Sequence, residues 1–138
     1  MAVFLTILTG VVVFVLGQII LKLLIEPWQQ QRDCVARIAH ILLYYANVYS
    51  NPGVGTDERN REASIETRRV ASDLIASCYR IPFYGRVCKS PLFPNLATIH
   101  EVRRHLVGLS NATHDGDPLK NGDRVDKIRK LLKLPDDE

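Results

Sequence analysis

The first 21 residues of this 138-residue sequence contain no charged side chain. All 18 Lys and Arg residues and all 15 Asp and Glu residues therefore lie in residues 22–138. A soluble enzyme spreads its charge along the chain, and a disordered tail is rich in charge. The split argues against both classes, and it indicates a membrane segment followed by a small, charge-rich domain.

Cysteine is also scarce, and no catalytic signature is present. Cys34, Cys78 and Cys88 are the three cysteines, and no two of them form a CxxC pair. Such a set does not make the disulfide framework of a small secreted domain, so reduced thiols are expected. The sequence has no GxSxG elbow, no HExxH motif and no glycine loop with a phosphate-binding pattern. We therefore expect a protein that is not an enzyme and that carries no cofactor.

What the N-terminus does have is a long apolar run, Met1–Leu21. About 20 helical residues span a hydrocarbon core of about 30 Å, so the run predicts a transmembrane helix. Lys22 can extend to the interface and leave Leu23–Ile25 immersed, which puts the boundary at Pro27-Trp28. A cleaved signal peptide is one alternative, but the run has no preceding basic residue and no small-residue cleavage site after it. A buried core helix is the other, but an uncharged run of this length is more than a small domain can bury.

The basic residues beside this segment predict its orientation. None precedes the span, whereas Lys22, Arg32 and Arg37 follow it closely. Basic residues next to a membrane span remain on the cytoplasmic side, so we expect the N-terminus outside the cell and the C-terminal domain in the cytoplasm. The lipid bilayer is then the first expected partner.

One side of the predicted span is rich in small or polar residues. Thr6, Gly10, Val13 and Gly17 lie on one helical stripe, and Gln18 lies beside it. Small residues allow close helix approach in lipid, and an amide can hydrogen-bond across an interface. The stripe predicts a homo-oligomer or pairing with another membrane protein. The alternative is that Gly and Thr are common in any membrane helix.

The rest of the chain predicts an all-α fold. Apolar residues recur at helical spacing over residues 28–49, 60–79, 95–109 and 123–134. Residues 51–60, 80–94 and 111–122 are rich in Pro, Gly or polar residues and are expected as loops. We therefore expect a transmembrane segment in 1–27, a cytoplasmic helical bundle in 28–110, and a linker, a short basic helix and an acidic tail in 111–138. Pro27 can bend one long helix or begin a new one.

Four phrases of the sequence are similar to a known family. They are GQIILKLLIEPWQ at 17–29, YYANVYSNPG at 44–53, IPFYG at 81–85 and LVGLSN at 106–111. Together they resemble a family of short, uncharacterised bacterial single-pass membrane proteins with a cytoplasmic helical domain. The resemblance implies an inner-membrane location and the same topology, and it assigns no catalytic residue.

The histidines, acidic residues and thiols form no convincing site. His100 and His105 lie on different faces of one predicted helix, and His40 and His114 are remote from them, so no metal site is expected. The spacing of Asp115, Asp117 and Asp123 does not fit a calcium loop. Cys88, between Arg86 and Lys89, is the only thiol in a basic setting, which leaves catalysis there as a remote alternative.

Two arginine pairs form the candidate anion-binding set: Arg68, Arg69, Arg103 and Arg104. Arginine forks bind phosphate or carboxylate, so pairs that converge would hold a small anionic ligand such as a nucleotide. The alternative is a solvated face neutralised by Glu62, Glu66, Asp73 and Glu101. The basic final helix suits a lipid surface, and no motif indicates specific nucleic-acid binding.

Two functions follow as hypotheses. The first is a membrane-anchored, non-enzymatic interaction or scaffold protein. The second is a membrane effector or sensor whose bundle binds an anionic ligand and acts on the transmembrane helix.

Overall fold

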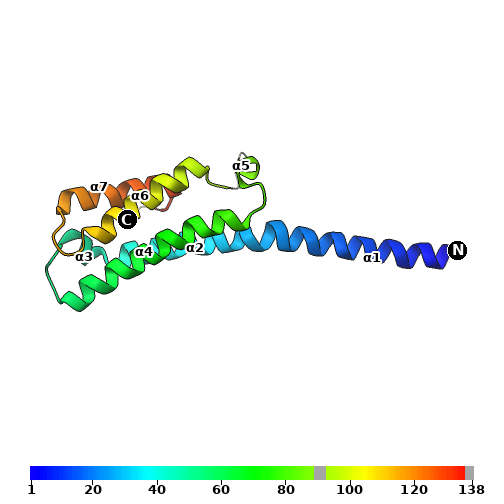
Figure 1. Cartoon of the computed structure of the whole chain (residues 1–138), viewed down its shortest axis with the longest axis horizontal. Coiled ribbons are helices and arrows are strands. Elements are labelled where there is room, and N and C mark those ends of the chain that lie inside the picture. The colour runs from blue at the N-terminus through cyan, green and yellow to red at the C-terminus, as the bar shows by residue number, and fades with distance from the viewer. Residues whose placement is uncertain (89–92, 136–138) are drawn as a thin grey trace.

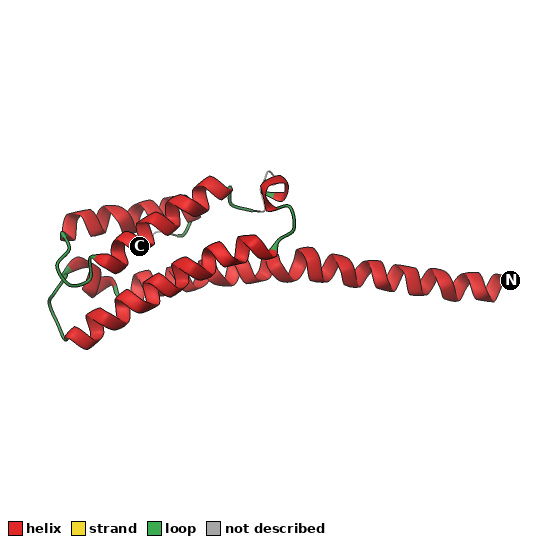
Figure 2. Cartoon of the chain, viewed as in Figure 1, coloured by secondary structure: helices red, strands yellow, loops and turns green. Residues whose placement is uncertain are grey.

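The computed structural model of the chain describes residues 1–88 and 93–135, and every regular element in those ranges is helical (Figure 2). The all-α expectation is confirmed. In chain order the elements are α1 Ala2–Ile20, a π-helical turn η1 Leu21–Ile25, α2 Glu26–Tyr44, α3 Ala46–Ser50, α4 Asp57–Arg80, α5 Tyr84–Val87, α6 Leu96–Asn111 and α7 Pro118–Leu132.

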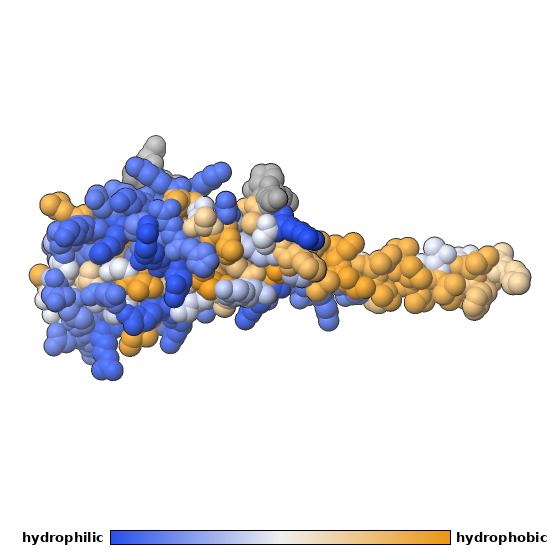
Figure 3. All heavy atoms as spheres, turned by 45° about the horizontal axis from the view of Figure 1, so that its top comes forward, coloured by the Kyte–Doolittle hydropathy of each residue, from blue (hydrophilic) through white to orange (hydrophobic). Residues whose placement is uncertain are grey.

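The first three elements are one continuous helix, Ala2–Tyr44, of 43 residues. Its N-terminal part is long and apolar enough to cross a membrane, and none of that part is buried in the chain. Figure 1 shows it projecting from the bundle, and Figure 3 shows its apolar surface beside the hydrophilic bundle. Of the two possibilities at Pro27, the structure therefore has one long helix that continues through the proline.

The π-helical turn explains how Pro27 is held inside this rod. Proline has no N–H to donate to the carbonyl of Leu23, and its ring crowds that carbonyl in a regular α-helix. The preceding turn is wider, since the N–H of Glu26 donates to the carbonyl of Leu21, five residues back. Pro27 follows in the first turn of α2 and is buried. A local change of helical pitch thus replaces the break that proline would otherwise cause.

The bundle is organised around α4, which packs against both α2 and α6, while α7 packs against α6 and α3. The predicted stripes of 60–79 and 95–109 are confirmed as core, because all their members are buried. They are Ala63, Thr67, Val70, Leu74 and Cys78 on α4, and Ile99, Val102, Leu106 and Leu109 on α6. From the other helices the core receives Ile38, Leu42, Tyr49 and Ile128.

Several predicted boundaries were wrong. The helix expected over 28–49 ends at Tyr44 and resumes as α3, because Tyr45 leaves helical geometry at φ −101° and ψ 17°. The loop expected over 80–94 contains the short helix α5. Asn95 is the N-cap of α6, since its side chain accepts the N–H of Ala97 at 3.1 Å.

The largest correction concerns the polar linker expected over 111–122. Helix α7 begins within it, at Pro118, after the side chain of Asp117 accepts the N–H of Leu119 at 3.0 Å. Asn121 is fully buried, and its amide donates to the carbonyl of Tyr49 at 3.1 Å. Pro at the first helical position and Asp before it are ordinary helix-start signals, which the polar composition masked. Helix α7 is therefore part of the bundle.

Replacing Asn121 by Ala should lower the free energy of unfolding of the full-length protein by about 1–3 kcal/mol, because the buried carbonyl of Tyr49 loses its partner. The matched control is Asn51→Ala, since Asn51 is exposed and its side-chain amide donates to the carbonyl of Asn47 in its own turn. Denaturant unfolding in detergent followed by circular dichroism measures both. Equal losses in the two variants would contradict this role for Asn121.

Candidate functional site

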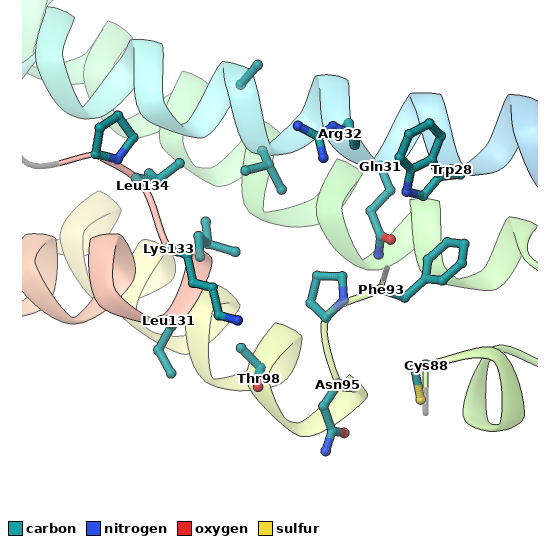
Figure 4. A pocket seen from close by; sticks show the side chains of 15 residues that line it. Trp28, Gln31, Arg32, Cys88, Phe93, Asn95, Thr98, Leu131, Lys133 and Leu134 are labelled. Carbon is teal, nitrogen blue, oxygen red and sulfur yellow. The ribbon is translucent and has the colours of Figure 1, made fainter. Parts of the chain in front are cut away.

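A cleft of about 840 Å³ opens between the start of α2, the approach to α6 and the end of α7 (Figure 4). It exists because α4 packs against both α2 and α6, whereas α2 and α6 scarcely touch each other. We call it the α2–α7 cleft. Its lining residues are Trp28, Gln31, Arg32, Val35, Ala36, Cys88, Phe93, Pro94, Asn95, Thr98 and Leu131–Pro135.

The walls of the cleft are mainly apolar, with one cation on each side. Arg32 comes from α2, where its guanidinium lies 5.5 Å from the centre of the Trp28 ring. Lys133 comes from the end of α7, where a left-handed backbone, φ 53°, terminates the helix. The indole N–H of Trp28 is buried and has no hydrogen-bond partner in the described part of the chain. The cleft can therefore receive an apolar group, and its two cations favour one with a negative charge.

Gln31, the last of three consecutive glutamines, connects the elements at the floor of the cleft. It is 2% exposed, and its amide donates to the Tyr84 hydroxyl at 2.8 Å. That hydroxyl donates in turn to the carbonyl of Pro94, also at 2.8 Å. Burial raises the pKa of Tyr84, so the phenol stays protonated and keeps donating. Nothing in the helical periodicity marks Gln31, because its partners come from α5 and the segment before α6.

The thiols of Cys34 and Cys78 are unsuited to nucleophilic chemistry at neutral pH. Burial raises the pKa of both, with nearby Asp73 adding to the effect at Cys34. Cys88 lines the α2–α7 cleft, while its neighbour Lys89 lies outside the described residues. Among the residues that the structure describes, no group of three His, Cys, Asp or Glu side chains is arranged to hold a metal.

The four candidate arginines have local partners or point into solvent. Arg68 donates to the Ser110 hydroxyl at 3.3 Å and to the Asn111 side chain, both at the end of α6. Arg69 pairs with Glu66 at 2.6 Å and Arg104 with Glu101 at 3.6 Å, each on its own helix, and Arg103 is exposed. None of the four lines the α2–α7 cleft.

Arg68 is also displaced along the bundle from the second pair. It lies level with Ser110, and Arg103 precedes Ser110 by seven residues, which is about 10 Å along a helix. The four arginines that the sequence suggested as an anion site therefore bond to neighbouring residues or are exposed to solvent. A different pair of cations, Arg32 and Lys133, lines a cavity.

The small-residue stripe on α1 is unpartnered within one chain. A Cβ added at Gly10 or Gly17 would meet nothing within 4 Å. The hydroxyl of Thr6 is already used, because it donates to the carbonyl of Ala2 at 3.0 Å. Gln18 is exposed, and in the described part of the chain its amide makes no hydrogen bond. Gly10, Gly17 and Gln18 are thus the members of the stripe that are available to contact another helix.

The tyrosines near the end of α2 divide between core and surface. Tyr45 and Tyr49 are buried, and the Tyr49 hydroxyl lies 2.7 Å from that of Thr67. Burial raises the pKa of Tyr49 to about 12. Tyr44 is exposed, stacks on His40 with ring centres 5.6 Å apart, and has Arg59 above its ring.

These elements define a class of structure: an open all-α bundle built directly on a long apolar helix. Comparison with protein-family models, with curated proteins and with solved structures finds no match. The resemblance to short bacterial single-pass proteins stays a prediction, and the function is argued from the geometry.

His105, on α6, should make stability depend on pH. Burial lowers its pKa, Arg104 and Lys127 lower it further, and Glu101 opposes them. Because the folded pKa lies below the unfolded value of about 6.5, stability should be complete above that value and decrease as the pH falls through it. Thermal melts between about pH 7.5 and about pH 5.5 measure this decrease.

His105→Gln should flatten that pH profile, because the variant has no imidazole to take up a proton at this site. Identical profiles for wild type and His105→Gln would show that His105 does not carry the effect.

Proposed function

We propose that this chain is a membrane-anchored, non-enzymatic interaction protein. The observation that supports this most is the continuous helix Ala2–Tyr44, which is exposed and apolar in its first part and supplies the bundle core in its second. An apolar surface of that length, open to water, would be strongly unfavourable, so a bilayer is its natural surrounding. The bundle then follows the anchor without a flexible linker.

Two features favour a retained anchor over a cleaved signal sequence. No small-residue cleavage site follows the apolar run, and the same helix continues into buried residues of the bundle, beginning with Pro27 and Gln31. The basic residues that follow the span favour a bundle on the cytoplasmic side, with the N-terminus outside. The family resemblance adds a bacterial inner membrane.

The proposed partner is a second membrane helix, from another copy of this chain or from another membrane protein. Gly10 and Gly17 leave space for close backbone approach, and the amide of Gln18 lacks a hydrogen bond in the described chain. An unsatisfied amide in hydrocarbon gains from a partner helix, and interhelical hydrogen bonds contribute about 0.6 kcal/mol on average.

Gly10→Leu with Gly17→Leu should lower the dimer fraction of full-length protein in proteoliposomes, because the added side chains hold the backbones apart. Energy transfer between labelled copies measures this fraction. Val15→Leu is the matched control, since Val15 lies on the opposite side of the helix. A wild-type chain that is strictly monomeric and crosslinks to no membrane protein would overturn the interaction proposal.

The second candidate function is an effector that binds a small anionic ligand. The observation that favours it is the α2–α7 cleft, which is lined by the cations Arg32, on the helix that continues from the π-helical turn, and Lys133. A bound ligand there would act on the segment that joins anchor and bundle. The arginine set Arg68, Arg69, Arg103 and Arg104 is the alternative location.

A panel of nucleotides and inorganic phosphate should raise the Tm of the full-length protein if this second function holds, because a ligand at 100 times its Kd contributes about 2.7 kcal/mol. Arg32→Glu with Lys133→Glu should abolish the shift if the cleft is the site. Charge reversal at the four arginines should abolish it if they are the site. No shift with any compound would contradict the effector function.

A further inference from the structure

The end of the bundle nearest the apolar helix lies close to the expected membrane surface. Arg80, at the end of α4, donates to the side chain of Gln30 at 2.8 Å, and Tyr84 is bonded to Gln31. Gln30 is five residues beyond Ile25, which is about 7.5 Å along the helix. The headgroup layer is about 5–8 Å thick on each side of the hydrocarbon, so the end of α4 reaches its outer edge. Figure 1 shows α5 at this same end of the bundle.

Aromatic side chains are exposed at this end rather than packed. Tyr79 is 81% exposed and Phe83 is 76% exposed, the highest values for aromatic residues in the described bundle. Phe83 adopts the left-handed region at φ 55°, a conformation that is costly for a bulky residue. Tyr84, the next residue, is buried in the core, so Phe83 is the aromatic residue of this pair that faces outward. Aromatic rings are favoured at the membrane–water interface, where an apolar ring and a polar surrounding meet.

Charge at this end suits an anionic surface. Residues 22–33 and 79–88 contain the basic side chains Lys22, Arg32, Arg80 and Arg86, against the acidic side chains Glu26 and Asp33. Arg86 lies above the Phe83 ring, with its guanidinium 5.9 Å from the ring centre. The loops at the far end, 51–56 and 112–117, contain two acidic residues and no Lys or Arg. The residues at the end near the apolar helix therefore carry a net basic charge, whereas these two far-end loops carry a net acidic one.

We propose that Tyr79, Arg80, Phe83 and Arg86 form a lipid-contact rim that rests on anionic headgroups. The inference rests on the proposed function, because it requires α1 to lie in a bilayer. The rim holds the bundle end-on against the membrane: the aromatic rings enter the headgroup layer and the guanidiniums pair with lipid phosphates. The rim accounts for the exposure of Phe83 and for its unfavourable backbone conformation, because its ring contacts lipid instead of the core.

Single-tryptophan variants test the rim in the full-length protein. Trp28 is the only tryptophan, and Trp28→Phe keeps the aromatic ring while removing an indole N–H that has no partner in the described residues. In that background, Phe14→Trp reports on the span, Phe83→Trp on the rim, and Leu119→Trp on the far end, where Leu119 is 83% exposed. Each is reconstituted in vesicles of phosphatidylglycerol and phosphatidylcholine that contain quencher lipids of two kinds: lipids brominated on the acyl chain report on position 14, and lipids spin-labelled on the headgroup report on positions 83 and 119.

The rim predicts loss of fluorescence at positions 14 and 83 and none at 119. It also predicts that the loss at 83 decreases when phosphatidylglycerol is omitted or when Arg80→Glu and Arg86→Glu are added. Quenching at 14 without quenching at 83 overturns the rim and leaves the anchor standing. Quenching at none of the three overturns the anchor as well. Equal quenching at positions 83 and 119 would show that the bundle does not contact the membrane by this end. Quenching at position 83 that is the same with and without phosphatidylglycerol would contradict the contact with anionic lipid.

Discussion

The structure depends on one constraint: a single helix is exposed and apolar in its first part and packs into the bundle in its second part, without a joint between them. From Ala2 to Ile25 its side chains are exposed and mostly apolar, and from Pro27 onward it enters a bundle whose core it helps to build. Backbone hydrogen bonds inside the helix satisfy its own polar groups, so the same segment is stable in hydrocarbon and in a protein core. Any motion or force at one end therefore acts on the other through a rod, with no flexible linker between them.

The junction between the exposed apolar part of the helix and the bundle contains several unusual local features. Pro27 would end an ordinary helix, and the π-helical turn before it keeps the rod intact. One turn later Gln31 connects the rod to Tyr84, and Tyr84 connects to the segment before α6. The α2–α7 cleft and the lipid-contact rim both lie within a few turns of this point. The proposed ligand site and the proposed lipid contact thus lie close to the region where the apolar helix joins the bundle.

The sequence predicted the parts of the fold that depend on repetition. The apolar stripes of α4 and α6 recur at helical spacing over many residues, so their buried members were identified correctly. The start of α7 was missed, because Pro118 and Asn121 sit in a polar, glycine-containing stretch and the contact of Asn121 with Tyr49 crosses 72 residues. The cleft was missed for a similar reason: Arg32 and Lys133 are far apart in sequence, and no periodic pattern pairs them. Conversely, the arginine pairs are conspicuous in the sequence, but in the fold Arg68, Arg69 and Arg104 bond to neighbouring residues and Arg103 is exposed.

The distance between a spin label at position 14 and one at position 40, in full-length protein in lipid nanodiscs, tests the central claim most directly. Both sites are exposed, and the native thiols are replaced first. A continuous helix predicts a single narrow distribution near about 39 Å, since the sites are separated by 26 residues. A broad or much shorter distribution would show a joint between anchor and bundle, and it would contradict the account of the protein as one rigid, membrane-anchored unit.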